Sequence, residues 1–239
     1  MAEAIEAVQL AYIDLSQGRA QVPARLPLPV ADREAVILYM PAYLPERGGL
    51  GAKMVTVFPR NQDLGLPTIY GLAVMHDAQT GRPTAIIEAA HLTALRTGAA
   101  SGVATRLLAR RDAHVVAIFG AGAQGRTQLE GVCSVRDIRQ AWVYDVRPEA
   151  ARRFVADMTA RGEPIPRDLR VAPSPSEAVR YADVICTATT SRQPVFSDAD
   201  IQPGTHINGI GSFSPEVQEV PAETVRRARV FVDSTETCV

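Results

Sequence analysis

The hydrophobic pattern at the start of the chain predicts one helix and then a run of strands. Apolar residues recur with a helical period from Ala4 to Leu15, and Gly18 stands where such a helix would end. Prolines punctuate residues 22–45 around the apolar run 36–40. This stretch is therefore expected to form at most short strands separated by turns.

Three longer apolar runs follow, joined by turn signals such as the one from Asp77 to Gly81. They comprise residues 51–59, 68–77 and 84–90, and their pattern predicts neighbouring strands of one sheet. A helix is expected to follow over residues 93–109.

Beyond residues 110–112 the pattern changes to apolar strands that alternate with helices. The expected strands comprise residues 115–119, 142–145, 183–189, 205–211 and 229–233. Such alternation is typical of α/β proteins with a doubly wound parallel sheet. The sequence therefore predicts two domains that meet near residue 111.

Composition and charge narrow the class of protein. With 239 residues, 46% of them hydrophobic, the chain can bury a sizeable core. A net charge of -1 gives no broad attraction to nucleic acid or to an anionic membrane, so neither is expected as a partner. The N-terminal sequence lacks the features of a signal peptide, and no apolar run is long enough to span a membrane, so a cytoplasmic protein is expected.

The cysteines and histidines do not indicate a disulfide framework or a metal site. Cys133, Cys186 and Cys238 are widely spaced and odd in number, and reduced thiols are expected. The four histidines are scattered without ligand spacing, so no metal is predicted.

A glycine-rich turn follows the first strand of the second half. Gly120, Gly122 and Gly125 form the pattern G-x-G-x-x-G, in which the three glycines permit a tight turn, close approach of a pyrophosphate and close helix packing. Asp145 lies about 20 residues further on, where a carboxylate would meet the ribose hydroxyls of NAD(H) and repel the 2′-phosphate of NADP(H). Arg147 could soften that preference. The alternatives are an ordinary tight turn and an aspartate that caps the next helix.

Three cationic residues in the first half are candidate substrate ligands. Lys53 lies inside an apolar run, small and apolar residues flank Arg96, and Arg25 lies in the proline-rich stretch. Lys53 and Arg96 are expected to be partly buried cations that need an anion, although isolated lysines and arginines are usually solvated surface charges. Arginine binds carboxylates through two hydrogen bonds and a desolvated lysine can move protons, so the pair suits an amino or imino acid.

Six motifs, in order, resemble the ornithine cyclodeaminase/mu-crystallin family. They are GAKMVTVFPRN, GLPTIYG, DAQTGRPTAIIEAAHLTALRTGAAS, GAGAQG, ATTSRQPVF and INGIGSFSPEVQEV, and the resemblance extends over essentially the whole chain. It implies a Rossmann-type NAD(P)-binding domain over residues 112–233 and a smaller α+β domain over residues 1–111 for substrate binding and dimerisation. Both chain ends are short for the family, so the smaller domain is expected to be incomplete and residues 234–239 to begin a returning segment.

Carried over by position, the resemblance implies roles for single residues. Lys53 and Arg96 would hold the substrate carboxylate and act in catalysis, with Lys53 near the proton transfer and Arg25 as a third substrate contact. The implied cofactor-binding residues are Thr68, Arg96, Thr97, Gly120, Gly122, Ala123, Gln124, Gly125, Asp145, Thr189 and Gly211. Gln124 and Thr189 could instead be ordinary polar residues of loops, and Thr97 could simply support its helix.

One position departs from the cyclodeaminases of the family. These enzymes, and some alanine dehydrogenases, resemble one another in placing an aspartate acid/base in the loop that reads Gly211 to Pro215 here, where Phe213 takes the corresponding position. A phenyl ring neither accepts nor donates the proton, so ornithine cyclodeamination is disfavoured. The G-S-F-x-P form is similar to the ketimine and pyrroline-2-carboxylate reductases of the family and to mu-crystallin.

The leading prediction is an NAD(P)H-dependent oxidoreductase that reduces a small cyclic or linear 2-imino acid, as a homodimer. The alternative enzyme is a cyclodeaminase or an alanine dehydrogenase, which would need another proton donor, such as Glu216 or Glu219. Both glutamates are expected at the surface. An alternative of another class is a crystallin-like protein that binds NAD(P)H or a small ligand without turnover.

Overall fold

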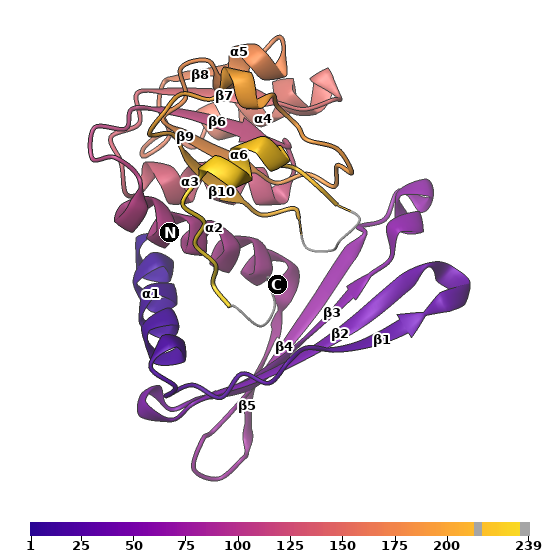
Figure 1. The fold of residues 1–239 in the computed structure, drawn as a ribbon. Helices are drawn as coiled ribbons and strands as arrows, with labels where there is room; N and C mark the ends of the chain where they lie inside the picture. Colours follow the sequence, from indigo (N-terminus) through magenta and orange to yellow (C-terminus); the bar gives the residue numbers. More distant parts are fainter. Residues whose placement is uncertain (213–216, 235–239) are drawn as a thin grey trace. The chain divides into compact units, whose positions relative to one another are not determined.

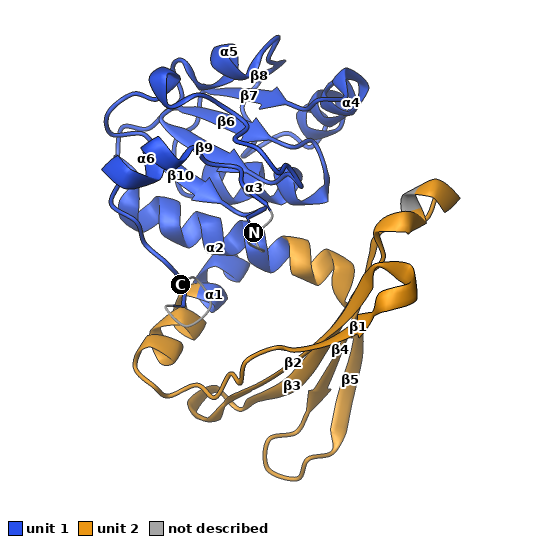
Figure 2. Ribbon diagram, turned by 45° about the vertical axis from the view of Figure 1, so that its right-hand side comes forward, with its two compact units in different colours: residues 1–8, 95–239 blue, residues 9–94 orange. Residues whose placement is uncertain are grey.

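The computed structural model of the chain describes residues 1–212 and 217–234. It divides into two compact units, coloured separately in Figure 2. The antiparallel-sheet unit comprises Gln9–Ala94, and the parallel-sheet unit comprises Met1–Val8 together with Leu95–Val239.

The antiparallel-sheet unit contains a five-stranded sheet whose strands lie side by side in chain order (Figure 1). The strands are β1 (Leu26–Val30), β2 (Ala35–Leu44), β3 (Gly49–Val57), β4 (Ile69–His76) and β5 (Pro83–Glu88). Antiparallel neighbours need only a short connection, and 3-10 helices at Ala31–Arg33, Pro45–Arg47 and Pro59–Leu64 supply three of them. The predicted neighbouring strands of one sheet are confirmed.

Strand β2 is longer than its prolines predict, and the expectation of only short strands here is wrong. Ten residues form β2, with Pro41 inside it. The N–H of Tyr43 donates to the carbonyl of Gln21, and since N–H directions alternate along a strand, the nitrogen of Pro41 faces the same side. On that side the first residue of β1, Leu26, pairs with Tyr39, so β1 does not reach as far as Pro41. The nitrogen of Pro41 therefore has no residue of β1 opposite it. Proline costs a ladder hydrogen bond only where a strand stands opposite its nitrogen.

Two helices span the boundary between the units along the chain. Helix α1 (Ala2–Ser16) confirms the predicted opening helix, and helix α2 (Ala89–Leu108) begins four residues before the predicted start. The Glu88 carboxylate accepts hydrogen bonds from the N–H groups of Ala90 at 2.7 Å and His91 at 3.2 Å. These bonds satisfy two of the free N–H groups of the first turn, so the helix can begin directly at the end of β5.

The parallel-sheet unit contains five parallel strands in the order β10-β9-β6-β7-β8. They are β6 (Val115–Phe119), β7 (Gln140–Tyr144), β8 (Asp168–Val171), β9 (Val184–Thr187) and β10 (His206–Gly209). The α-helices that follow β6 in the chain are α3 (Ala123–Cys133), α4 (Pro148–Thr159), α5 (Pro175–Val179) and α6 (Ala222–Arg227). The chain winds outward from β6 through β7 and β8, then returns to β9 and β10 on the other side. This order is the predicted doubly wound, Rossmann-type sheet, although the sequence interpretation missed β8.

Both faces of the parallel sheet are buried, as the central strand shows. Val116 and Ile118 on β6 pack into one hydrophobic cluster with residues of α3 and α4, whereas Ala117 and Phe119 pack into a second cluster with residues of α5. All four side chains are at most 1% exposed. A strand buried on both faces is expected to be a continuous apolar run, as VVAIF is.

The prediction of a last strand at residues 229–233 is wrong. These residues have no regular secondary structure, and Val230, Phe231 and Val232 are 62%, 57% and 48% exposed. The run is apolar, but a strand forms only where a neighbouring strand satisfies its backbone groups. Within residues 1–212 and 217–234, the edge strand β10 pairs only with β9.

Glycines bring α2 and α3 together backbone to backbone. A Cβ atom at Gly98 would lie 2.2 Å from the carbonyl oxygen of Thr127, and one at Gly131 would lie 2.1 Å from that of Gly98. Most of α2 therefore packs with the parallel-sheet unit, although it precedes the predicted boundary at residue 111. The functional division into residues 1–111, 112–233 and 234–239 stays a prediction.

Candidate dinucleotide-binding site

The predicted cofactor residues of the parallel-sheet unit gather at one edge of its sheet. The glycine turn follows β6, Asp145 follows β7, Thr189 lies just beyond β9, and Gly211 lies just beyond β10. These four strands are neighbours and parallel, so their carboxyl ends share one edge. Doubly wound sheets bind ligands at that edge, where the strand order reverses. Here the order reverses at β6.

Two glycines of the turn are required by the turn itself. Gly120 has a φ of 96°, which disfavours any side chain, and a Cβ atom there would lie 2.4 Å from the carbonyl oxygen of Ala188. A Cβ atom at Gly125 would lie 2.0 Å from the carbonyl oxygen of Gly120. These two positions therefore form the turn and pack the helix against it, as the pattern predicts.

Gly122 differs, because the space beside it is open. A Cβ atom at this exposed residue would meet no atom within 4 Å. Gly122 is the N-cap of α3 and provides no side-chain cap, so the N–H groups of the first helical turn, which begins at Ala123, are available to a ligand. The buried Oε1 of Gln124 also has no hydrogen-bond partner among the described residues. Open space, free N–H groups and the positive end of the helix dipole fit a pyrophosphate.

Asp145 connects the glycine turn to the end of β7. Its Oδ2 accepts a hydrogen bond from the N–H of Ala121 at 2.9 Å, and its Oδ1 accepts one from the N–H of Arg147 at 2.9 Å. Arg147 is the N-cap of α4, so these two bonds do not cap the first turn of that helix. Each carboxylate oxygen keeps a second acceptor position for a ribose hydroxyl. The Arg147 side chain is 76% exposed, with its Nε 3.7 Å from Oδ1.

Glu219 is buried at the same edge, so its expected surface position is wrong. It is 0% exposed and accepts hydrogen bonds from Thr187, Thr189 and Gly211. The sequence interpretation named Glu219 only as an alternative proton donor and missed its burial, for which the local signal was the pair of apolar residues close to it, Val217 and Val220. Its burial depends on donors that are distant in the sequence.

Lys53 lies half-buried on β3, as its apolar surroundings predict. It shares a sheet face with Val55, which is 7% exposed. Gly71, which pairs with Val55, is so close to Ala89 that an added Cβ atom would lie 3.0 Å from its carbonyl carbon. The first residue of α2 therefore covers this face beside Lys53.

Arg96 is exposed, and its expected partial burial is wrong. The residues of α2 that face the packing interface include Thr97, Gly98 and Ser101, whereas Arg96 shares the opposite side with Ala100. The small residues beside Arg96 in the sequence are buried, but Arg96 itself is not. Lys53 and Arg96 belong to different units, so their joint action on a substrate stays a prediction.

The remaining candidates are placed as follows. Arg25 is exposed and precedes β1, and Thr68 is half-buried before β4, with its carbonyl accepting a hydrogen bond from the N–H of Phe58 at 2.8 Å. Cys133 and Cys186 are free, and burial raises the pKa of each thiol to about 12. The positions outside the described residues are Phe213, Glu216 and Cys238.

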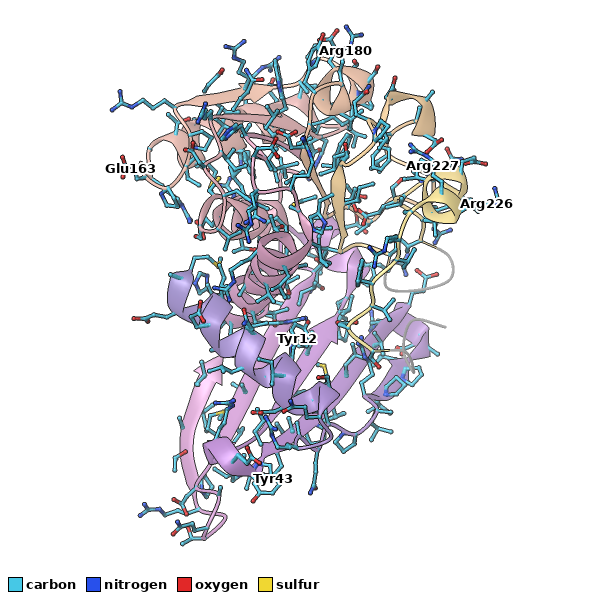
Figure 3. The ribbon with its side chains drawn as sticks, turned by 60° about the vertical axis from the view of Figure 1, so that its left-hand side comes forward. Tyr12, Tyr43, Glu163, Arg180, Arg226 and Arg227 are labelled. Carbon is cyan, nitrogen blue, oxygen red and sulfur yellow. The ribbon has the colours of Figure 1, made fainter. Side chains whose placement is uncertain are left out.

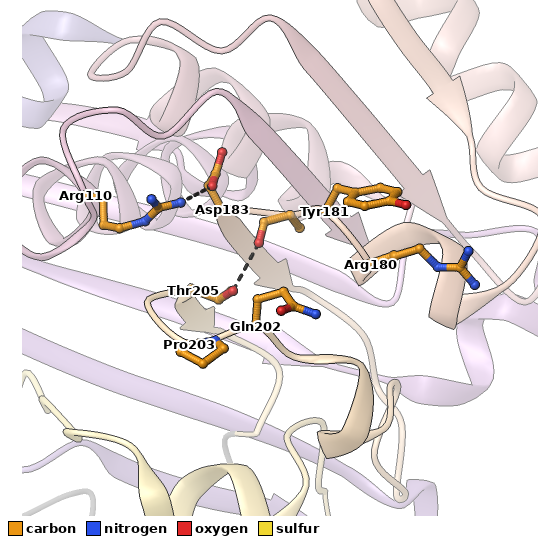
Figure 4. Close-up of a pocket in the computed structure, with 8 residues that line it drawn as sticks. Arg110, Arg180, Tyr181, Asp183, Gln202, Pro203 and Thr205 are labelled. Carbon is orange, nitrogen blue, oxygen red and sulfur yellow. Dashed lines mark hydrogen bonds and ion pairs between the residues drawn. The ribbon is translucent and has the colours of Figure 1, made fainter.

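A pocket of about 380 Å³ lies at the other edge of the parallel sheet, before the starts of β9 and β10 (Figure 4). Arg110 and Asp183 form an ion pair in its wall. The other oxygen of Asp183 accepts hydrogen bonds from the N–H groups of His114 at 2.8 Å and Val115 at 3.0 Å. These charges therefore hold the start of the sheet together, and the predicted cofactor residues lie elsewhere.

The sheet order, the open glycine turn and the carboxylate after the next strand define a dinucleotide-binding protein of the Rossmann type. The sequence model of the ornithine cyclodeaminase/mu-crystallin family matches residues 1–238, and the chain belongs to this family. No helix formed by the described residues is both long and apolar enough to cross a bilayer.

Three relatives illustrate the similarity. The chain is 40% identical over 238 residues to a Delta(1)-pyrroline-2-carboxylate reductase of Bacillus cereus, covering 99% of this chain and 72% of that protein. It is 38% identical over 236 residues to an alanine dehydrogenase of Archaeoglobus fulgidus, covering 99% and 70%. Among solved structures, the Delta(1)-pyrroline-2-carboxylate reductase of Thermococcus litoralis, in complex with NADH and L-proline, has a TM-score of 0.90 and 42% identity, covering 95% and 70%.

Proposed function

We propose that this protein is an NAD(P)H-dependent oxidoreductase that reduces a small 2-imino acid to the amino acid. The observation that carries the proposal is the open turn at Gly122 beside Asp145, in a chain that is 40% identical to a Delta(1)-pyrroline-2-carboxylate reductase. When bound, NADH supplies a hydride to the imine carbon, and a proton completes the amine. A five-membered cyclic imine with a 2-carboxylate is the preferred substrate class.

Different residues of the chain bind the cofactor, bind the substrate carboxylate and transfer the proton. The N–H groups at the start of α3 hold the pyrophosphate, and Asp145 accepts the ribose hydroxyls and disfavours a 2′-phosphate. Arg96 pairs with the substrate carboxylate. Lys53, half-buried on β3, holds the same carboxylate and manages the proton.

The test is the oxidation of NADH, followed by absorbance, with separate substrates. Pyrroline-2-carboxylate, piperideine-2-carboxylate, and pyruvate with ammonia test the reductase and alanine dehydrogenase reactions, and ornithine with NAD tests the cyclodeaminase. We expect the highest kcat/KM with pyrroline-2-carboxylate. If ornithine is consumed faster than either cyclic imine is reduced, the proposal is wrong. Tight NADH binding without turnover of any substrate would support the crystallin-like alternative.

We further propose that the protein is a homodimer formed through its antiparallel sheet. Every residue of the edge strand β5 is exposed, including Ile86 at 72% and Ile87 at 40%. Exposed apolar residues on a sheet edge favour association. Light scattering coupled to gel filtration should give twice the chain mass, and Ile86→Lys should give the mass of a monomer. A monomeric wild type would refute this assembly.

A further inference from the structure

The carboxylate of Glu219 joins two loops at the carboxyl edge of the parallel sheet. Its Oε1 accepts hydrogen bonds from the N–H of Thr189 at 2.6 Å and from the hydroxyl of Thr189 at 2.7 Å. Its Oε2 accepts hydrogen bonds from the hydroxyl of Thr187 at 2.8 Å and from the N–H of Gly211 at 2.6 Å. One side chain thus holds the loop after β9 to the loop after β10.

Only a carboxylate satisfies this set of donors. All four donors are uncharged, and two of them are backbone N–H groups that cannot become acceptors. These two N–H groups, of Thr189 and Gly211, face different oxygens of Glu219. In a glutamine at this position, the amide nitrogen would face one of the two N–H groups whichever way the amide turned. The group is 0% exposed, and its four hydrogen bonds compensate for the lost contact with water.

Gly211 lies so close to this carboxylate that a side chain would not fit there. A Cβ atom at Gly211 would lie 2.6 Å from the carboxylate carbon of Glu219 and 2.1 Å from the carbonyl oxygen of Thr189. The segment that carries Glu219 is itself held in place, because the N–H of Val195 donates to the Glu219 carbonyl at 2.9 Å and the N–H of Glu219 donates to the hydroxyl of Ser212 at 3.2 Å. Glu219 is therefore held by its backbone as well as by its side chain.

The position of the two loops connects Glu219 to the cofactor. The glycine turn and Asp145 follow β6 and β7 and receive the adenosine half of the dinucleotide. A doubly wound sheet binds the two halves on either side of the strand at which the order reverses, which is β6 here. The loops after β9 and β10 therefore belong to the nicotinamide half, and both of them are held by Glu219.

We propose that Glu219 is a positioning residue that sets the nicotinamide half of the site by holding residues 187–189 at the end of β9 to residue 211 just after β10. The inference rests on the proposed function, since it assigns these loops to a bound nicotinamide. Glu219 does not move the proton, because its acceptor positions are all occupied.

The decisive variant is Glu219→Gln, which keeps the size and removes one acceptor. Affinity for NADH should fall about 10-fold or more, the usual scale for an unsatisfied buried N–H group. Affinity for 5′-ADP, which occupies only the adenosine half, should stay within about 2-fold because the glycine turn is unchanged. Misplacement of the nicotinamide should also lower kcat for imine reduction, by about 100-fold for a shift of the order of 1 Å. The primary deuterium isotope effect with NADH deuterated at C4 should rise, because reduction then limits turnover.

The matched control is Glu223→Gln on α6, where the carboxylate is 66% exposed and 3.5 Å from Arg226 Nη1. Arg226 and Arg227 lie on the same short helix (Figure 3). This variant makes the same chemical change four residues away and should leave every measurement at the wild-type value. If Glu219→Gln weakens 5′-ADP and NADH equally, or leaves both NADH affinity and the isotope effect unchanged, Glu219 does not set the nicotinamide half.

Thr187→Val is a second variant in case Glu219→Gln fails to fold. It removes a single donor to Oε2 at a residue that is 0% exposed and keeps the side-chain shape. The same selective loss of NADH over 5′-ADP is expected, at a smaller size of about 3-fold to 10-fold. A wild type that binds NADH but reduces none of the imines would overturn the proposed function, while the ratio of NADH to 5′-ADP affinity would still decide the role of Glu219.

Discussion

Replacing Gly122 by valine should abolish cofactor binding and leave the fold intact. An added Cβ atom at Gly122 meets nothing within 4 Å, and the residue has a φ of -83° and a ψ of -168°, an extended conformation that valine adopts readily. In the free protein the side chain therefore enters open space. In the complex its two methyl groups occupy the volume that the pyrophosphate needs.

The magnitudes separate these two effects. Gly122 is the N-cap of α3, and valine is a poorer N-cap than glycine, so the variant should lose about 1 kcal/mol of stability. For a chain of this size that corresponds to roughly 2–4 °C in Tm. Loss of pyrophosphate contact should weaken NADH binding by at least about 100-fold, or roughly 2.7 kcal/mol. Gly125→Ala is the contrasting variant, because its Cβ atom would lie 2.0 Å from the Gly120 carbonyl oxygen and must displace the backbone.

Thermal unfolding and a fluorescence titration with NADH measure both quantities on the same samples. We expect Gly122→Val to unfold near the wild-type temperature without saturable NADH binding, and Gly125→Ala to unfold at a clearly lower temperature. Micromolar NADH affinity in Gly122→Val would refute the reasoning, because it would show that the pyrophosphate lies elsewhere.

Three further predictions concern single side chains. Lys53→Met should keep NADH binding but lower imine turnover by about 100-fold, and Lys53→Arg should not restore it, because a guanidinium stays protonated; near-normal turnover in both variants would make Lys53 a structural cation. Asp145→Ser should raise NADPH affinity relative to NADH in a titration, unless the wild type already prefers NADPH, in which case the assignment of Asp145 is wrong. Burial lowers the pKa of His206 below its ordinary value of about 6.5, so the unfolded chain binds the proton first and Tm should fall as the pH drops below 6.5. His206→Gln should flatten that pH dependence, and an unchanged slope would contradict it.

The sequence predicted those parts of the fold that are determined by residues close together in the chain. The alternation of strands and helices predicted the parallel sheet, and G-x-G-x-x-G predicted the turn between β6 and α3. The turn geometry agrees with the pattern, because Gly120 and Gly125 each have a close backbone neighbour, whereas Gly122 borders open space. The errors occurred where the deciding partner is distant. Residues 229–233 are apolar enough for a strand, yet β10 pairs only with β9 within the described part of the chain.

The same difference between local signals and distant partners applies to the residues of the candidate site. Asp145 could be found from its spacing to the glycine turn, whereas the burial of Glu219 could not be predicted, because its hydrogen-bond donors lie near the ends of β9 and β10. Arg96 was misjudged for a related reason. Its neighbours in the sequence are small and apolar, but the period of the helix buries Thr97 and Gly98 and leaves the arginine on the outside. Burial of a charged residue is a property of the packed structure and not of its flanking sequence.

The contact between α2 and α3 also bears on how such an enzyme can change its substrate. Main-chain atoms meet at Gly98 and Gly131, so the spacing between these helices is set by the polypeptide backbone and does not depend on the size of any side chain there. Helix α2 carries Arg96, and α3 begins at the pyrophosphate turn. In the proposed function Arg96 anchors the substrate carboxylate and the turn anchors the cofactor, so this contact within the parallel-sheet unit keeps the two anchors at one separation. Under that function, substitutions elsewhere in the chain would change which imino acid is recognised, while the separation set by this contact would be inherited unchanged.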